Sequence, residues 1–206
     1  VSFAIQAGQT VGVVGESGCG KSVTAMSLMG LLPPQAARLD GGEIRFQGQD
    51  LLRLKPAKMA DIRGNELAMI FQEPMSALNP VLTIGDQLCE PLIRHRGESP
   101  KAAWQHAIQL IAGVGLARAE SLMNSYPHQL SGGMLQRVMI AMALSCQPKL
   151  LIADEPTTAL DVTVQAQILR LLRDQAREHH MALMLITHDL GVIAQMAEQV
   201  VVMYAG

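Results

Sequence analysis

Short apolar runs alternate with longer amphipathic segments along this chain. Continuous runs of Val, Ile, Leu and Met are typical of buried parallel strands, and the segments between them have helical periodicity. Helices are predicted over Lys21–Met29 and Val162–His180 and within the long stretch from Ile84 to Leu144. Strands that alternate with helices predict an α/β fold built on a mostly parallel sheet. The predicted strands are Thr10–Val14, Leu67–Phe71, Leu150–Ala153, Ala182–Thr187 and Gln199–Tyr204.

Two regions depart from this alternation. Val1–Gln6 and Gly42–Gly48 contain short alternating runs beside glycine-rich turns, which predict a small antiparallel β part. Residues 75–128 contain turn residues and amphipathic stretches such as Lys101–Ala112, which predict an inserted helical subdomain.

The expected organisation is one domain over residues 1–206. Residues 1–74 and 129–206 form its core together with the antiparallel part, and residues 75–128 form the insertion. The chain starts inside a predicted strand and stops directly after another, so we expect the natural domain to extend past both ends.

Composition narrows the class of protein. Hydrophobic residues make up 49% of the chain and charged residues 17%, which is typical of a folded domain and excludes disorder. A net charge of −2 disfavours nucleic acid as a partner, and no apolar run approaches the roughly 18 residues that span a bilayer. Cys19, Cys89 and Cys146 are widely spaced, which argues against a disulfide framework or a zinc site and suits a reducing cytoplasm.

Polar residues follow four of the predicted strands. Gly15 opens a glycine-rich loop after the first, Gln72 follows the second, Asp154 and Glu155 end the third, and His188 follows the fourth. Ligands of parallel sheets bind outside the carboxyl ends of the strands, so these residues predict one site at one sheet edge.

The glycine-rich loop matches the phosphate-binding pattern G-x-x-x-x-G-K-[ST] between a strand and a helix. Its glycines let backbone N–H groups face phosphate oxygens, and the following helix offers its N-terminal N–H groups. Lys21 supplies a positive charge for the β- and γ-phosphates, and the Ser22 hydroxyl is a ligand for Mg²⁺. The predicted nucleotide-binding residues are Gly15, Glu16, Ser17, Gly18, Cys19, Gly20, Lys21 and Ser22.

The acidic pair fits nucleotide hydrolysis. Asp154 is placed to serve the Mg²⁺ shell and Glu155 to accept a proton from attacking water, although either could instead cap the next turn. Asp161 precedes a predicted helix and could be an N-cap, a contact of the site, or both. Gln72 and His188 carry little weight alone, because a single histidine after a strand is more often structural.

A second glycine motif runs from Leu130 to Arg137. Ser131 is placed as an N-cap, and Gly132 and Gly133 leave the start of the next helix open to an anion. The chain already has a phosphate loop, Gly15–Ser22, for the nucleotide that it binds itself. This motif is therefore either a plain helix cap or a site for a nucleotide that another molecule holds.

The sequence Leu-Ser-Gly-Gly-Met-Leu-Gln-Arg resembles the signature of ABC ATPases, with its core at Ser131–Gln136. The other elements of that family stand in order around it. Four further stretches are similar to the peptide/nickel importer branch: Phe71–Met75, Leu78–Pro80, Tyr126–Gln129 and Asp154–Thr163. The matching elements are the Walker A loop Gly15–Ser22, the Q-loop residue Gln72, the Walker B strand Leu150–Glu155, the D-loop Ala159–Asp161 and the switch histidine His188.

The resemblance implies the P-loop NTPase fold of ABC ATPase type and a head-to-tail dimer that encloses two ATP molecules. Ser131, Gly132, Gly133 and Gln136 would contact the nucleotide held by the partner's loop, and Asp161 would line the dimer seam. In the chain's own site, the resemblance implies that Lys21, Gln72, Glu155 and His188 act in catalysis, with His188 sensing the γ-phosphate. It also implies that Ser22, Gln72 and Asp154 hold Mg²⁺.

The resemblance also implies partners and a location. Transmembrane permease subunits and an extracytoplasmic solute-binding protein are expected as partners, and nucleic acid is not. The ATPase is expected to lie peripherally on the cytoplasmic face of the inner membrane.

Two further points concern the adenine contact and an alternative function. The family stacks adenine on an aromatic residue upstream of the phosphate loop, and Phe3 is too close to Gly15 for that role. The alternative is a non-transport ABC ATPase that acts on nucleic acid or ribosomes, but the segment between Gln72 and Ser131 shows no heptads for a long coiled coil.

Overall fold

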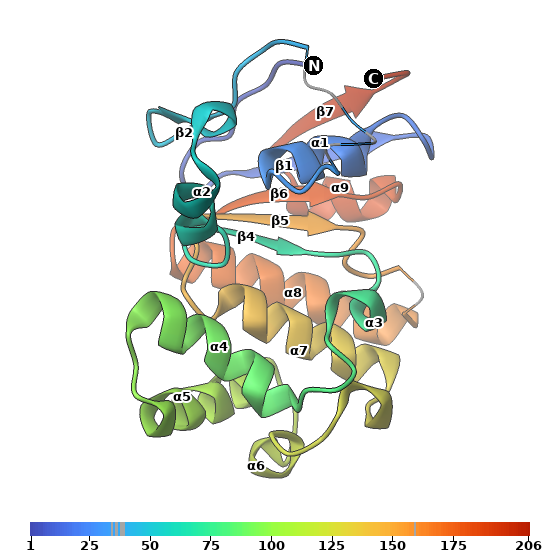
Figure 1. Cartoon of the computed structure of the whole chain (residues 1–206). Coiled ribbons are helices and arrows are strands. Elements are labelled where there is room, and N and C mark those ends of the chain that lie inside the picture. Colours follow the sequence, from blue (N-terminus) through green and yellow to red (C-terminus); the bar gives the residue numbers. More distant parts are fainter. Residues whose placement is uncertain (34, 36, 38–39, 159) are drawn as a thin grey trace.

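The computed structural model describes residues 1–33, 35, 37, 40–158 and 160–206. Within this part of the chain, a parallel sheet with strand order β4-β5-β6-β1-β7 forms the centre of the molecule (Figure 1). All its pairings are parallel, as the sequence predicts, and the predicted strand ends differ by at most one residue. The strands are β1 (Thr10–Gly15), β4 (Leu67–Ile70), β5 (Leu150–Asp154), β6 (Ala182–Ile186) and β7 (Gln199–Met203).

Successive side chains of the strands enter two separate cores, as the two-residue period of a strand requires. In β5, Leu151 and Ala153 pack on one face of the sheet while Ile152 packs on the other, and all three are fully buried. The first face is covered by α7 (Gly132–Leu144), α8 (Val162–Glu178) and α9 (Leu190–Met196), and the second by α1 (Lys21–Leu28) and α2 (Pro56–Ile62) (Figure 1).

The helices of residues 75–128 pack against α7 and extend the layer of helices that covers the first face of the sheet. The expected long helical stretch is divided into separate helices, because Gly97 at φ 66° ends α4 and Pro100 begins α5 after the cap of Ser99. Thr83 and Asp86 form a capping box that fixes where α4 begins. The helices are α3 (Pro74–Ala77), α4 (Ile84–Arg96), α5 (Pro100–Gly113) and α6 (Ala119–Leu122), followed by the 3-10 turn η2 (Pro127–Gln129).

The antiparallel part is smaller than the sequence predicts. It consists of β2 (Arg45–Phe46) and β3 (Gln49–Asp50), followed by the 3-10 turn η1 (Leu51–Arg53). The expectation of a strand over Val1–Gln6 is wrong. A strand needs a partner for its backbone groups, and in the described part of the chain the backbone hydrogen bonds of this segment are those that close the local turn between Gln6 and Gln9.

Candidate functional site

The phosphate loop joins β1 to α1 as predicted. Gly18 and Gly20 have φ angles of 81° and 101°, which side chains with a Cβ rarely adopt. A Cβ on Gly15 would lie 2.3 Å from the carbonyl oxygen of Met203 and 2.5 Å from the Sγ of Cys19. These positions therefore require glycine: Gly15 because the loop passes close to β7, and Gly18 and Gly20 because of their backbone conformation.

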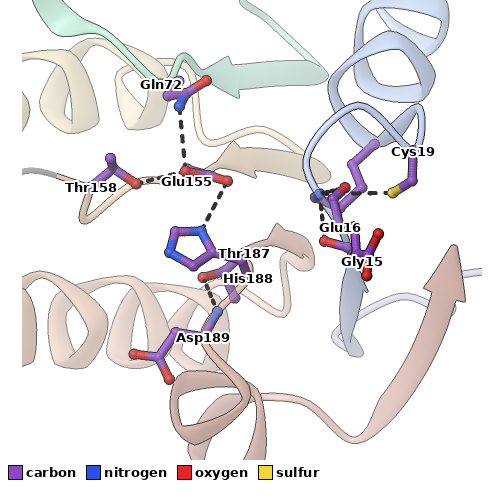
Figure 2. Close-up of polar contacts among 10 residues, drawn as sticks. Gly15, Glu16, Cys19, Gln72, Glu155, Thr158, Thr187, His188 and Asp189 are labelled. Atoms are coloured by element: carbon purple, nitrogen blue, oxygen red, sulfur yellow. Dashed lines mark hydrogen bonds and ion pairs between the residues drawn. The ribbon is translucent and has the colours of Figure 1, made fainter. Parts of the chain in front are cut away.

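Lys21 occupies the interior of this loop. Its side chain is almost fully buried, and its Nζ donates hydrogen bonds to the carbonyl oxygens of Gly15 at 2.8 Å and Glu16 at 2.9 Å (Figure 2). The Sγ of Cys19 lies 3.8 Å from the same nitrogen. Among the described residues, no carboxylate forms a close ion pair with this buried ammonium, so the loop favours an anionic ligand.

Asp154 and Ser22 form the part of the site that fits a divalent cation. Asp154 is buried at the end of β5, and its Oδ1 has no hydrogen-bond partner among the described residues. Burial raises the pKa of Asp154 and the charge of Glu155 adds to this, against the opposing effects of Ser22 and Lys21. A cation would compensate this buried charge, and oxygen ligands are those that Mg²⁺ prefers, so the residues fit the ion.

Glu155 lies where the segments that follow β4, β5 and β6 meet. Its Oε2 accepts hydrogen bonds from the Thr158 hydroxyl at 2.8 Å and from the Gln72 amide at 3.3 Å (Figure 2). Its Oε1 lies 3.2 Å from Nδ1 of His188. Because a carboxylate only accepts, Nδ1 of His188 carries the proton in this contact. The structure thus brings together the predicted residues at the ends of β4, β5 and β6.

The backbone and the pKa of Glu155 are both shifted from ordinary values. Its φ of 46° is in the left-handed region, where non-glycine residues cluster at functional sites. Burial alone raises the pKa of Glu155. Hydrogen bonds from Thr158 and His188 and the positive charges of His188 and Lys21 outweigh burial, so the pKa lies below its usual value. The group is therefore an ionised carboxylate at neutral pH.

The two predicted N-caps differ in detail. Asp161 caps α8 through a hydrogen bond of 2.9 Å from the backbone N–H of Val164, so the capping alternative is confirmed. Ser131 occupies the N-cap position of α7 but makes no side-chain capping bond, and Ser131 and Gly132 are exposed. The hydroxyl and the first N–H groups of α7 are therefore available to a ligand outside the chain. Ala159 of the predicted D-loop lies outside the described residues.

Gln136 is placed differently from its neighbours in the signature. Its side chain is 3% exposed, and its Nε2 donates a hydrogen bond of 2.7 Å to the carbonyl oxygen of Pro156. Gln136 thus contacts its own chain directly after Glu155.

Phe3 is packed against the core on the α1 face of the sheet.

Thr158 is the residue of this site that sequence patterns missed. It lies on no strand end and belongs to no phosphate-binding pattern, but it follows Glu155 by three residues, the spacing of a tight turn. The backbone N–H of Thr158 does donate to the carbonyl oxygen of Glu155 at 3.2 Å. A hydroxyl at that position in a turn is the signal that could have identified it.

The comparisons with known proteins decide the family. The sequence model described as "ABC transporter" matches residues 1–158. The chain belongs to the ABC transporter family. It is 56% identical over its whole length to the dipeptide transport ATP-binding protein DppD of Bacillus subtilis (strain 168), and 52% identical to the oligopeptide transport ATP-binding protein OppD of Salmonella typhimurium.

The fold of this ABC chain is that of solved ABC cassettes. It superposes on the dimeric, post-hydrolysis ATP-binding cassette MJ0796 bound to ADP and Pi with a TM-score of 0.87 and 30% sequence identity, covering 99% of this chain and 84% of that one. The chain spans 62% of the length of DppD and 61% of that of OppD. Among the described residues, no helix combines the length and the apolar character needed to cross a bilayer.

Proposed function

We propose that this chain is the ATP-binding and ATP-hydrolysing part of a membrane transporter, one that imports peptides or chemically related solutes such as nickel complexes. The observation that carries the proposal is the convergence of Gln72, Glu155 and His188 at the sheet edge that also bears the phosphate loop. The transport function of the relatives, dipeptide and oligopeptide transport, supports the class of solute.

ATP would bind with its phosphates in the loop Gly15–Ser22. The ammonium of Lys21 would exchange its backbone acceptors at Gly15 and Glu16 for oxygens of the β- and γ-phosphates. The backbone N–H groups of residues 16–21 and the start of α1 would contact the remaining phosphate oxygens. The buried position of Lys21 strengthens this attraction because little water screens it.

Ser22, Asp154 and Gln72 would hold Mg²⁺ beside these phosphates. When bound, the ion would neutralise negative charge on the phosphates during hydrolysis. The orphaned Oδ1 of Asp154 is the strongest support for this role, because a buried carboxylate oxygen without a partner is rare in folded proteins.

Glu155 would act as the general base for hydrolysis. Its ionised carboxylate would accept a proton from the water that attacks the γ-phosphate, while Thr158 holds the carboxylate in place. His188 would contact the γ-phosphate and report its presence to Glu155, with which it shares a hydrogen bond. Gln72, on the segment after β4, would be released from Glu155 as substrate enters.

A second ATPase subunit, identical or paralogous, would complete each site. Ser131, Gly132 and Gly133 at the exposed start of α7 would bind the γ-phosphate held by the partner subunit, and Asp161 would line the seam. ATP would then join the two subunits and its hydrolysis would release them. This is the differential affinity that a ligand-driven switch requires. The dimeric solved relative supports this arrangement.

The helices of residues 75–128 would act as the inserted subdomain that transmits this motion to permease subunits. A cleft of about 260 Å³ separates α4 from the end of β4, with apolar walls from Met69, Phe71 and Met139 and polar groups of Glu90 and Arg94 at its side. Such a cleft suits a short segment of a membrane-embedded partner. The ATPase would lie peripherally on the cytoplasmic face of the membrane, and a solute-binding protein would deliver the cargo from the other side.

Exchange of the proposed base tests the proposal. In the full-length protein, Glu155→Gln should lower the ATPase rate at least about 100-fold, the usual scale for loss of a general base, and leave Mg-ATP affinity within about threefold. Glu178→Gln, on the exposed end of α8, is the matched control and should keep the wild-type rate. Retention of the rate in Glu155→Gln would overturn the assignment of the base.

A further inference from the structure

The buried end of the signature segment touches the loop that carries the proposed base. Gln136 lies one helical turn beyond Gly132 on α7, and its Nε2 donates 2.7 Å to the carbonyl oxygen of Pro156, the residue directly after Glu155. Both Gln136 and Pro156 are buried. A buried carbonyl needs a donor, so this bond fixes the distance between α7 and the Glu155 loop.

The loop itself is tightly constrained. The backbone N–H of Glu155 donates to the carbonyl oxygen of Ile186 at 2.9 Å, and the turn closes through Thr158, whose N–H donates to Glu155 at 3.2 Å. Glu155 is held in the left-handed region. A backbone in this region persists only where its surroundings determine it, and the bond from Gln136 is the one that reaches the turn from α7.

We propose that Gln136 is a positioning residue that joins the signature helix of a chain to the catalytic carboxylate of the same chain. The inference rests on the proposed function. The start of α7 faces the partner's nucleotide, whereas Glu155 serves the chain's own. The bond from Gln136 to Pro156 therefore connects two parts of the chain that serve different ATP molecules. One is the start of α7, one helical turn away, which would bind the partner's ATP, and the other is the Glu155 loop, which would act on the chain's own ATP.

The same observations separate this role from direct nucleotide binding. Ser131 and Gly132 are exposed and have no side-chain bond or bulk that would prevent a ligand from approaching. Gln136 is 3% exposed, and its amide is already engaged inside the chain. It could reach a partner's nucleotide only by leaving the core and abandoning the Pro156 carbonyl.

The test is a double-mutant cycle in the full-length protein between Gln136→Leu and Glu155→Gln. Leu has similar bulk and no donor. Alone, Gln136→Leu should lower kcat about tenfold, which corresponds to loss of one buried hydrogen bond, with KM for ATP within about twofold of wild type. In the Glu155→Gln background, Gln136→Leu should leave the residual single-turnover rate unchanged, because no carboxylate remains to be positioned.

Two controls accompany the cycle. Gln175→Leu, on α8, makes the same exchange away from the site and should keep the wild-type rate, because the Gln175 amide donates to Glu178 on the same helix. Thermal unfolding of each variant shows whether it folds. If Gln136→Leu does not, Gln136→Met replaces it, because Met adapts to the cavity without introducing a donor.

Several results would overturn the positioning role. A rise in KM for ATP with unchanged kcat would show that Gln136 is a nucleotide ligand. A further tenfold loss in the Glu155→Gln background would show that its effect does not pass through Glu155. If Glu155→Gln alone kept the wild-type rate, the proposed function would fail, whereas a normal rate in Gln136→Leu beside an inactive Glu155→Gln would reject only the positioning role.

Discussion

The hydroxyl of Thr158 donates a hydrogen bond of 2.8 Å to the Oε2 of Glu155, within a turn whose backbone is closed by the same two residues. This bond does two things at once. It orients the carboxylate, and it is the largest of the effects that lower the pKa of Glu155 against the opposing effect of burial. A residue to which sequence patterns assign no role in the site therefore contributes to both the geometry and the ionisation of the proposed base.

Thr158→Val should therefore lower kcat about tenfold, the scale for one hydrogen bond to a charged group, because it keeps the shape of the side chain and removes the hydroxyl. Thr158→Ser keeps the hydroxyl and should retain most of the rate. Steady-state ATPase assays of the full-length variants measure both. Equal rates in the Val and Ser variants would show that the hydroxyl has no part in catalysis.

Packing of α4 against α5 gives a prediction about stability. A Cβ on Gly85 would lie 2.6 Å from a ring carbon of Trp104 and 2.8 Å from the carbonyl oxygen of Met123, whereas a Cβ on Gly113 would meet nothing within 4 Å. Both glycines are helical. Gly85→Ala should destabilise the protein by about 1–3 kcal/mol, and Gly113→Ala should be neutral or stabilise it by up to about 1 kcal/mol.

Urea unfolding of the two full-length variants gives this comparison. Because the same exchange is made in two neighbouring helices, a difference between the variants reports packing and not helix propensity. An equal effect of the two substitutions would contradict the close contact between Gly85 and Trp104.

His95 gives a prediction about pH. Burial lowers the pKa of His95 and the charge of Arg94 adds to this, while Asp61 opposes it. The folded protein thus binds this proton less readily than the unfolded chain. As the pH falls below about 6.5, the unfolded chain gains the proton first, and the free energy of unfolding decreases until the folded pKa is reached.

His95→Gln should make the free energy of unfolding depend less on pH over this window. Urea unfolding at about pH 7.5 and about pH 5.5, for the wild type and the variant, measures the difference. A larger fall in the variant than in the wild type would show that the sign of the His95 contribution is wrong.

Much of the site follows from local sequence patterns. Four site residues each end or follow an apolar run: Gly15, Gln72, Asp154 and His188. Parallel strands bring such positions to one edge of the sheet even when the runs lie far apart in the sequence. The strands β1, β4, β5 and β6 are recognisable because they are buried on both faces and hence continuously apolar, whereas β7 at the edge of the sheet is largely exposed. Positions whose backbone requires glycine are also visible in the sequence, as the glycines of the phosphate loop show.

What could not be predicted depends on tertiary contacts. The strand expected over Val1–Gln6 has the right residue pattern, but a strand forms only where a partner accepts its backbone hydrogen bonds. Gln136 belongs to a recognisable motif, but its orientation toward Pro156 depends on how α7 packs beside the sheet. The role of Thr158 likewise depends on the left-handed backbone of Glu155, which no residue pattern specifies.

The measurement that tests the central claim most directly is the solution mass of Glu155→Gln by light scattering, with and without Mg-ATP, on the full-length protein. If two chains enclose ATP between the phosphate loop of one and Ser131–Gly133 of the other, loss of the base should trap the closed pair, and the mass should double with Mg-ATP. A mass that stays monomeric while ATP binding is demonstrated would contradict the pairing of identical chains.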